Sequence, residues 1–226
     1  MTSDPAERLG VIGVVDAVTR RLRDRILAGE VDADTALTEA KVSAAFGVAR
    51  PSAKAAIEQL VASGLLMRTA HRSARVVAID AAMVRDVYRT RMRLESSALR
   101  ELARARAVPD DARSANAELL AMPAAADTAT VDPDLRFHTA LIDAVGSIRT
   151  SRMYRSVLDE VRLCMAQVQG RRLLKAAAIA QQHAGILDAI GAGDADRAAT
   201  LLAEHLTAAE DRLVVALAGS DAARHS

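Results

Sequence analysis

Hydrophobic residues recur every three to four positions along most of this 226-residue chain, while aromatic residues are scarce. The sequence holds two Phe, two Tyr and no Trp, although 51% of its residues are hydrophobic and 26% are charged. This spacing is that of an amphipathic helix, whereas β-sandwiches and barrels rely on alternating aromatic and β-branched residues. The pattern therefore predicts a mainly α-helical protein with a sizeable buried core, and it excludes an all-β fold.

One part of the chain, residues 11–79, also contains strand-like sequence. Three short helical stretches, each closed by a glycine, precede two extended runs, Leu65–Met67 and Arg75–Ile79. The polar, basic segment Arg68–Ser73 lies between these runs. Three helices followed by a β-hairpin is the order of a winged helix-turn-helix. We therefore expect residues 11–79 to form a DNA-binding domain with a small hairpin wing.

From residue 80 to residue 226 the sequence predicts helices only. Six stretches have helical periodicity, at about 80–107, 109–121, from 132 onward, 151–169, 172–190 and 194–217. Asp132 and Pro133 predict the start of the third, with Asp as N-cap and Pro at the first helical position. We expect an antiparallel all-α bundle over residues 80–226, and a flexible tail over residues 1–10.

Charge and cysteine content narrow the class of protein. The net charge is +1, so any DNA contact must come from local placement of basic side chains rather than from bulk charge. The single cysteine, Cys164, excludes an internal disulfide and a cysteine-rich zinc finger, and fits a reducing compartment. No apolar run has the length of a membrane span, and the N-terminal sequence is unlike a signal peptide. We expect a cytoplasmic protein without membrane contact.

A helix-turn-helix reads DNA through the N-terminal residues of its second helix. The candidate DNA contacts lie at three places. Arg50, Ser52 and Lys54 are at the start of that helix, Thr38 and Lys41 are at the start of the helix before it, and His71 and Arg72 are at the wing tip. The alternative is a winged helix that contacts protein, in which these side chains are only solvated.

Four polar residues fall on apolar faces of the expected bundle. Asp134 and His138 are four residues apart, so both project from one face of a helix. His183 and His205 each share a helical stripe with apolar residues. Buried imidazoles and carboxylates need partners, and one divalent cation would satisfy all four groups. Spacing alone leaves open a metal site or a hydrogen-bonded core. The ligand types suit zinc first, with nickel, cobalt or manganese as alternatives.

Arg91 is predicted to point into the bundle, because it shares a stripe with Val84, Val87 and Ala98. A buried guanidinium needs an anion. That anion is either the carboxylate of a bound effector, which would make Arg91 an effector-binding residue, or an acid on a neighbouring helix.

Short motifs run through the first domain: Ile26 with Gly29, Leu37–Glu39, Phe46–Arg50, and Leu60 with Gly64 and Leu65. Over Arg20–Ile79 they resemble the DNA-binding head of the GntR family of bacterial transcription regulators. The resemblance implies that Arg50 reaches DNA, and that Lys54 stands where the family usually has a second arginine. Ala49 and Pro51–Ser52 replace the usual Ser and Thr-Pro. We therefore expect an operator unlike the commonest ones of the family.

The second domain carries four further motifs: Arg91 with Leu94 and Glu95, Asp134 with Phe137 and His138, His183 followed by Ile186–Asp194, and His205 with Leu206. Over residues 80–217 these resemble the FCD ligand-binding domain of the FadR subfamily. The resemblance implies that Asp134 and the three histidines hold a divalent metal, whose coordination a small carboxylic acid completes. Two departures stand out: Val145–Ser147 replaces the usual Ala-Gly-Asn, which bears on the polarity of the pocket, and Gln182 replaces a usual glutamate.

The sequence thus predicts a homodimeric regulator, a repressor, that binds double-stranded operator DNA and senses a small carboxylate through a metal. Two alternatives remain. One is a metal-dependent hydrolase, because a site of three His and one Asp with open positions can activate water. The other is a regulator whose metal is purely structural. No motif supplies a general base near the site, and catalysis would leave the winged helix without a role, so we do not expect an enzyme.

Overall fold

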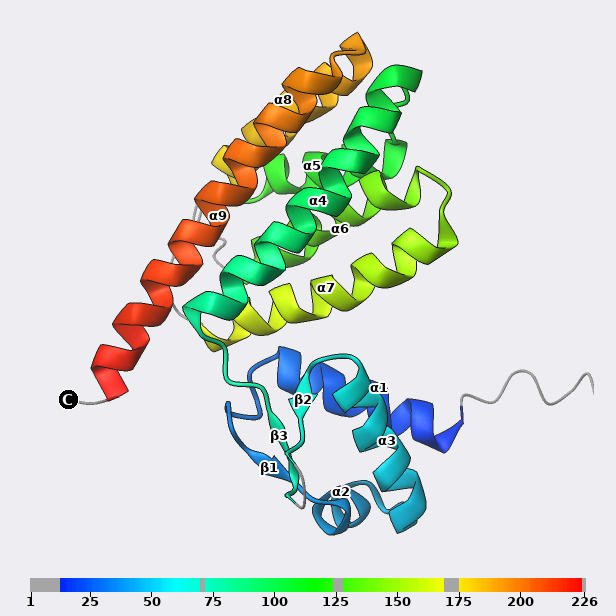
Figure 1. The fold of residues 1–226 in the computed structure, drawn as a ribbon, viewed down its shortest axis with the longest axis vertical. Coiled ribbons are helices and arrows are strands. Elements are labelled where there is room, and N and C mark those ends of the chain that lie inside the picture. Colours follow the sequence, from blue (N-terminus) through cyan, green and yellow to red (C-terminus); the bar gives the residue numbers. More distant parts are fainter. Residues whose placement is uncertain (1–12, 70–71, 124–127, 169–174, 225–226) are drawn as a thin grey trace, which may run out of the picture. The chain divides into compact units, whose positions relative to one another are not determined.

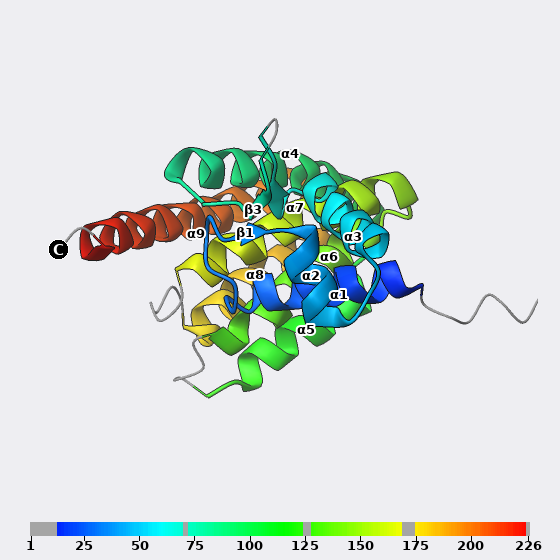
Figure 2. The same cartoon turned by 90° about the horizontal axis from the view of Figure 1, so that it is seen from below.

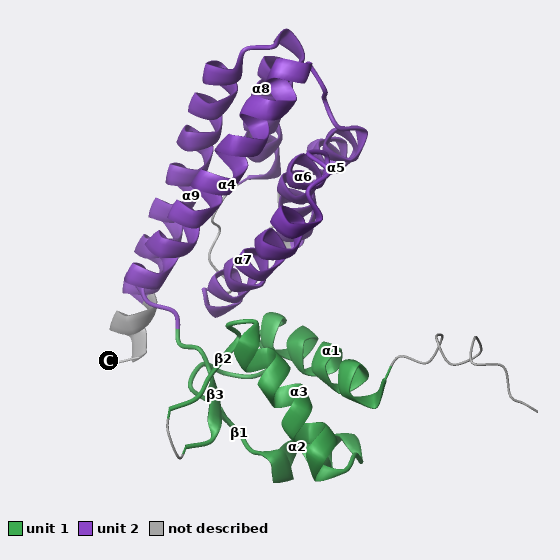
Figure 3. Ribbon diagram, turned by 45° about the vertical axis from the view of Figure 1, so that its right-hand side comes forward, with its two compact units in different colours: residues 1–78 green, residues 79–226 purple. Residues whose placement is uncertain are grey.

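The computed structural model describes residues 13–69, 72–123, 128–168 and 175–224. The chain divides into two compact units, residues 1–78 and residues 79–226 (Figure 3). The first unit contains α1 (Val14–Leu27), β1 (Ala36–Leu37), α2 (Glu39–Phe46), α3 (Arg50–Ala62), β2 (Leu66–Met67) and β3 (Ala74–Val76) (Figure 1). The second contains α4 (Ala81–Ala105), α5 (Asp110–Ala121), α6 (Val131–Asp143), α7 (Ile148–Gln167), α8 (Ala176–Ala192) and α9 (Ala195–Arg224). These elements confirm the predicted fold class, a winged helix-turn-helix followed by a helical bundle.

The helices of the first unit pack around one small apolar core. Its buried side chains come from all three helices and from the sheet: Val18, Leu22, Ile26, Val42, Ile57, Leu60, Leu66 and Val76. Thr38 caps α2, because its hydroxyl accepts a hydrogen bond from the backbone N–H of Lys41 at 3.1 Å. Gly47 ends α2 with φ +63°, a conformation that favours glycine and allows the tight turn into α3. α3 begins at Arg50, so Pro51 is its second residue and not its first.

The wing contains the predicted hairpin and one further strand. β3 pairs antiparallel with β2, and Leu66 lies opposite Val76. β3 also pairs antiparallel with β1, so the strand order is β1-β3-β2. The sequence did not predict β1, because two residues are too few to show a period of two.

In the second unit the two longest helices, α4 and α9, pack along each other (Figures 1 and 2). α4 also contacts α6, α7 and α8. It therefore lies at the centre of the bundle, beside the three helices that carry Asp134, His138, His183 and His205. None of the helices in the described ranges has the length and apolar composition needed to cross a membrane.

Most predicted helix ends lie within two residues of the observed ones. α7 begins at Ile148 rather than at 151, α8 begins at Ala176 rather than at 172, and two further ends differ for clear reasons. Asp194 caps α9 as expected, through a 2.9 Å bond from the backbone N–H of Arg197. α6 begins at Val131, after a 3-10 turn at Thr128–Thr130, and not at Pro133. Proline is tolerated at any position in the first turn, because those N–H groups have no partner within the helix. α9 continues past residue 217 to Arg224, since one glycine costs a helix only about 1 kcal/mol.

Candidate metal centre and nucleic-acid interface

Three helices of the second unit bring four buried side chains to one point. Asp134 and His138 lie on α6, His183 on α8 and His205 on α9. All four are buried, and each offers one oxygen or nitrogen within 4.8 Å of the others. The Oδ1 atom of Asp134 lies 3.4 Å from Nε2 of His183, 3.8 Å from Nε2 of His205 and 3.9 Å from Nε2 of His138. The structure therefore brings together all four residues that the sequence singled out.

Two of the four separations, 3.2 and 3.4 Å, match adjacent ligand atoms around one divalent ion, and the other two, 3.8 and 3.9 Å, are longer. A metal that binds ligands at about 2.0–2.1 Å separates adjacent ligand atoms by about 3.0–3.5 Å and opposite ones by about 4.2 Å. Nε2 of His138 and Nε2 of His205 are 3.2 Å apart, within that range. Within the described part of the chain neither ring nitrogen of His183 makes a hydrogen bond, although both are buried. A buried polar atom without a partner is rare, and metal ligation would satisfy one of these two.

The electrostatics of the cluster also suit a cation. Burial acts to raise the pKa of Asp134, but contact with His183 and electrostatic attraction to the three imidazoles outweigh it and hold that pKa below its ordinary value. Burial lowers the pKa of His183, and it lowers the pKa of His205 further. At neutral pH these two imidazoles are uncharged and the aspartate is ionised, which are the protonation states that metal ligands require.

A second set of contacts orients the three imidazole rings. Nδ1 of His138 donates to Oε2 of Glu95 at 2.5 Å, and Nδ1 of His205 donates to Oε1 of Gln182 at 2.9 Å. These partners fix the tautomers that leave Nε2 free for a metal. His183 is held differently: its ring stacks on Phe137, with centroids 3.6 Å apart and planes 4° from parallel.

Arg91 is buried as predicted, but its anion is not on a neighbouring helix. Its Nε donates to Oε1 of Glu95 at 2.9 Å, one turn along α4 itself. The hydroxyl of Tyr154 donates to the same oxygen at 2.6 Å. Burial acts to raise the pKa of Glu95, yet Arg91 and His138 outweigh it and lower that pKa to about 2. Glu95 is thus a site residue that sequence reasoning missed. Its i,i+4 relation to Arg91 on an apolar face was the available signal.

One nitrogen of the Arg91 guanidinium lacks a hydrogen bond within the described part of the chain. Its Nη2 atom is buried and makes no hydrogen bond to any described residue. The guanidinium carbon lies 5.1 Å from the centroid of the Tyr88 ring, within cation–π range. The hydroxyl of Tyr88 is likewise buried without a partner among the described residues.

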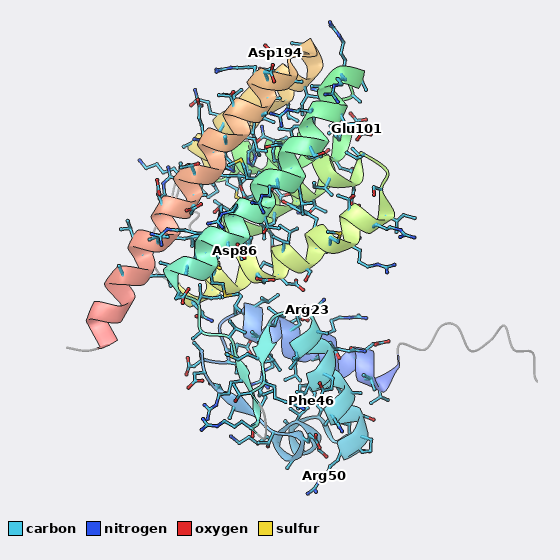
Figure 4. The ribbon with its side chains drawn as sticks, viewed as in Figure 1. Arg23, Phe46, Arg50, Asp86, Glu101 and Asp194 are labelled. Carbon is cyan, nitrogen blue, oxygen red and sulfur yellow. The ribbon has the colours of Figure 1, made fainter. Side chains whose placement is uncertain are left out.

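The first unit presents a basic, hollowed surface where α2, α3 and the wing meet. An open pocket of about 380 Å³ is lined by the residues that start α2, by Arg50, and by Arg68, Arg72 and Ser73 of the wing. Arg50 extends outward from the start of α3 (Figure 4). No side chain caps that helix end, so the N–H groups of Arg50 and Ser52 point to where a phosphate can bind, whereas Pro51 has no N–H.

Six of the seven predicted DNA-contact residues can be placed. Thr38, Arg50 and Arg72 line the pocket, whereas Lys41 and Lys54 are exposed beside it and Ser52 is half-buried in the first turn of α3. The seventh, His71, lies outside the described residues. Arg68 lines the pocket too, where it pairs with Glu58 at 2.6 Å, and sequence reasoning had not singled it out.

Comparison with known proteins agrees with both halves of this description. The family model of bacterial regulatory proteins of the gntR family matches residues 14–76, and that of the FCD domain matches residues 86–208. No match was found among curated proteins.

Several solved structures are similar. A transcriptional regulator GntR from Rhodococcus sp. RHA1 is 25% identical, with a TM-score of 0.68 over 88% of this chain and 97% of that one. McbR/YncC of E. coli is 16% identical, with a TM-score of 0.69 over 87% of this chain and 95% of that one. The Zn²⁺-bound FCD domain of TM0439, a transcriptional regulator, is 23% identical, with a TM-score of 0.52 over 62% of this chain and 97% of that domain.

The order of the two units and the two matched domains lead to one assignment. A winged helix-turn-helix precedes a helical domain, whose described residues form α4 to α9, and the FCD model alone covers more than half of the chain. The protein therefore belongs to the GntR family of transcription regulators, as a DNA-binding regulator of the GntR and FCD type.

Proposed function

We propose that this protein is a homodimeric repressor whose first unit binds operator DNA and whose second unit senses a small carboxylic acid through a bound divalent metal. The observation that carries the proposal is the convergence of Asp134, His138, His183 and His205 within 4.8 Å. Zinc is the metal we favour, because three imidazoles and one carboxylate suit it and because the similar FCD domain of TM0439 has a Zn²⁺-bound form.

The centre suits a sensor better than a catalyst. When bound, the metal supplies a Lewis-acidic centre for a ligand oxygen. Hydrolysis would need a free general base beside it. Glu95 is the acid behind the centre, but its two oxygens already accept from Arg91, His138 and Tyr154. The unpaired Nη2 of Arg91 instead offers a donor for an effector carboxylate.

Operator binding with and without effector tests this function. The operator can be selected from random duplexes by the zinc-loaded protein, and its affinity then measured by fluorescence anisotropy. A carboxylic acid that acts as effector should weaken operator binding by the zinc-loaded protein and should leave the metal-free protein unchanged. If every acid has the same effect with and without zinc, the metal has no part in sensing.

Removal of the Arg50 side chain should weaken specific DNA binding. Arg50→Ala is expected to cost about 1–3 kcal/mol of operator affinity, because a good base contact is worth that much. Lys54→Ala should mainly make the plot of log affinity against log salt concentration shallower, by about one unit of slope, because one fewer phosphate is neutralised. Arg93→Ala, an exposed arginine on α4, is the control. If both variants bind the operator with the same affinity as the wild type at two salt concentrations, the proposed interface is contradicted.

A two-fold dimer is expected in solution. One winged helix covers a short stretch of DNA, and two related by symmetry read an inverted repeat. Light scattering at micromolar concentration should give about 48 kDa, twice the 23.9 kDa mass of the chain. A mass of one chain, both with zinc and without it, would contradict the dimer.

A further inference from the structure

The buried charges around the proposed metal centre are few and can be counted. Among the described residues, the buried side chains of the types Asp, Glu, Lys and Arg are Arg91, Glu95 and Asp134. Arg91 and Glu95 form an ion pair at 2.9 Å, so their charges cancel. Asp134 is left as the one buried negative charge without a cationic side chain bound to it.

The side chains that accept hydrogen bonds from Nδ1 of His138 and from Nδ1 of His205 differ in charge. Glu95 accepts from Nδ1 of His138, whereas Gln182 accepts from Nδ1 of His205. An amide and a carboxylate orient a histidine equally well, but only the carboxylate adds a negative charge. With a divalent ion in place and Asp134 as its one anionic ligand, the centre therefore keeps a net charge of about +1.

A second observation concerns two buried donors on α4. Arg91 Nη2 and the Tyr88 hydroxyl are both buried, lie one turn apart on α4, and have no hydrogen-bond partner among the described residues. Each can donate to an oxygen. The charge of Arg91 is already balanced by Glu95, so these donors can bind the oxygens of one carboxylate, but they do not provide the charge that a second carboxylate would need.

We propose that Gln182 determines the charge of the ligand: by placing an amide behind His205, it leaves the loaded centre with one positive charge, which selects a singly charged carboxylate over a doubly charged one. This inference rests on the proposed metal site. A carboxylate at position 182 would bring the centre to neutrality, so it should strengthen metal binding and weaken anion binding. Loss of local structure would weaken both.

The test uses Gln182→Glu, with Gln181→Glu as the matched control. Gln181 is the same residue type on the same helix and is exposed, so its variant adds an equal charge away from the centre. Gln182→Met is a third variant, which removes the bond to His205 without adding charge. Metal content is measured first, by elemental analysis. Zinc affinity is then measured by competition with a chelator, and anion binding by calorimetry at constant ionic strength.

The anions are acids paired by chain length, propionate with malonate and butyrate with succinate. In the zinc-loaded wild type and in Gln181→Glu, each monocarboxylate should bind at least about tenfold tighter than its dicarboxylate partner. Gln182→Glu should bind zinc more tightly than the wild type, and it should bind the monocarboxylates at least about tenfold more weakly. An added unit charge one imidazole ring away from the metal changes anion affinity by at least this factor at an effective dielectric constant of about 20. Gln182→Met should bind zinc more weakly and keep the preference for single charge.

Each contrary result has a distinct meaning. A wild type without stoichiometric metal overturns the proposed function itself. Three other results leave the metal site in place and overturn the role of Gln182. The metal-loaded wild type could bind the dicarboxylates as tightly as the monocarboxylates, or bind none of the four acids at millimolar concentration. Gln182→Glu could also bind the anions as tightly as the wild type does.

Discussion

Replacement of Glu95 by leucine is expected to lower the free energy of unfolding of the metal-free protein by about 3–5 kcal/mol, the cost of leaving a buried ion without its partner. Glu95 is fully buried, and its carboxylate accepts from Arg91, Tyr154 and His138. Leucine has a similar size but accepts from none of them. The guanidinium of Arg91 would then remain in the core without an anion. Urea unfolding followed by far-UV circular dichroism measures the loss.

Two further variants show whether this loss comes from the unpaired charge. Glu101→Leu is the same substitution at an exposed position on α4 (Figure 4) and should change the stability by less than about 0.5 kcal/mol. In the double variant Arg91→Met with Glu95→Leu, no charge is left unpaired, so it should be more stable than Glu95→Leu alone. If Glu95→Leu costs no more than Glu101→Leu, the Arg91–Glu95 pair does not exist in solution.

Zinc is expected to stabilise the second unit, and His183→Ala should abolish that effect. A ligand that binds the folded state alone adds about 4 kcal/mol at a thousandfold excess over its dissociation constant. The ligands come from α6, α8 and α9, so the ion holds three helices together. The ring nitrogens of His183 make no hydrogen bond to any described residue, so the variant removes a metal ligand and breaks no hydrogen bond, although it also removes the 3.4 Å contact with Asp134. Its stacking contact with Phe137 is also lost, which should lower the metal-free stability by a smaller amount.

Thermal unfolding with zinc and after treatment with a chelator measures this difference. His225→Ala removes a histidine that has no part in the proposed centre, and it should keep the full response to zinc. A zinc response of wild-type size in His183→Ala would show that the stabilising ion binds elsewhere.

The sequence predicted the helical fold and the burial of the four polar side chains because both depend on spacing. The i,i+4 pair of Asp134 and His138, and the apolar stripes around His183 and His205, were enough to place all four side chains inside the bundle. Helix ends were predicted where a glycine or a capping side chain marks them, as at Gly47 and Asp194.

What the sequence did not reveal depends on contacts between distant residues or on short elements. Glu95 lies 43 residues before His138, and no local pattern links the two. Arg91 was predicted to be buried, but its partner was not identified. The apolar stripe around Arg91 shows that the side chain points inward, and it does not show whether the acid that pairs with it lies on the same helix or on another. β1 has two residues and forms only because β3 pairs with it. The start of α6 is set by the 3-10 turn before it, and Pro133 fits several positions in that first turn.

The central claim is that Asp134, His138, His183 and His205 bind one divalent ion. Elemental analysis of protein purified without chelator and incubated in turn with zinc, nickel, cobalt and manganese tests it most directly. The account predicts one ion per chain for the wild type, zinc bound most tightly, and well below one for alanine at any of the four positions, with far-UV helicity nearly intact. A wild type that retains no stoichiometric ion from any of the four metals would contradict it, and the four residues would then be a polar cluster in the core.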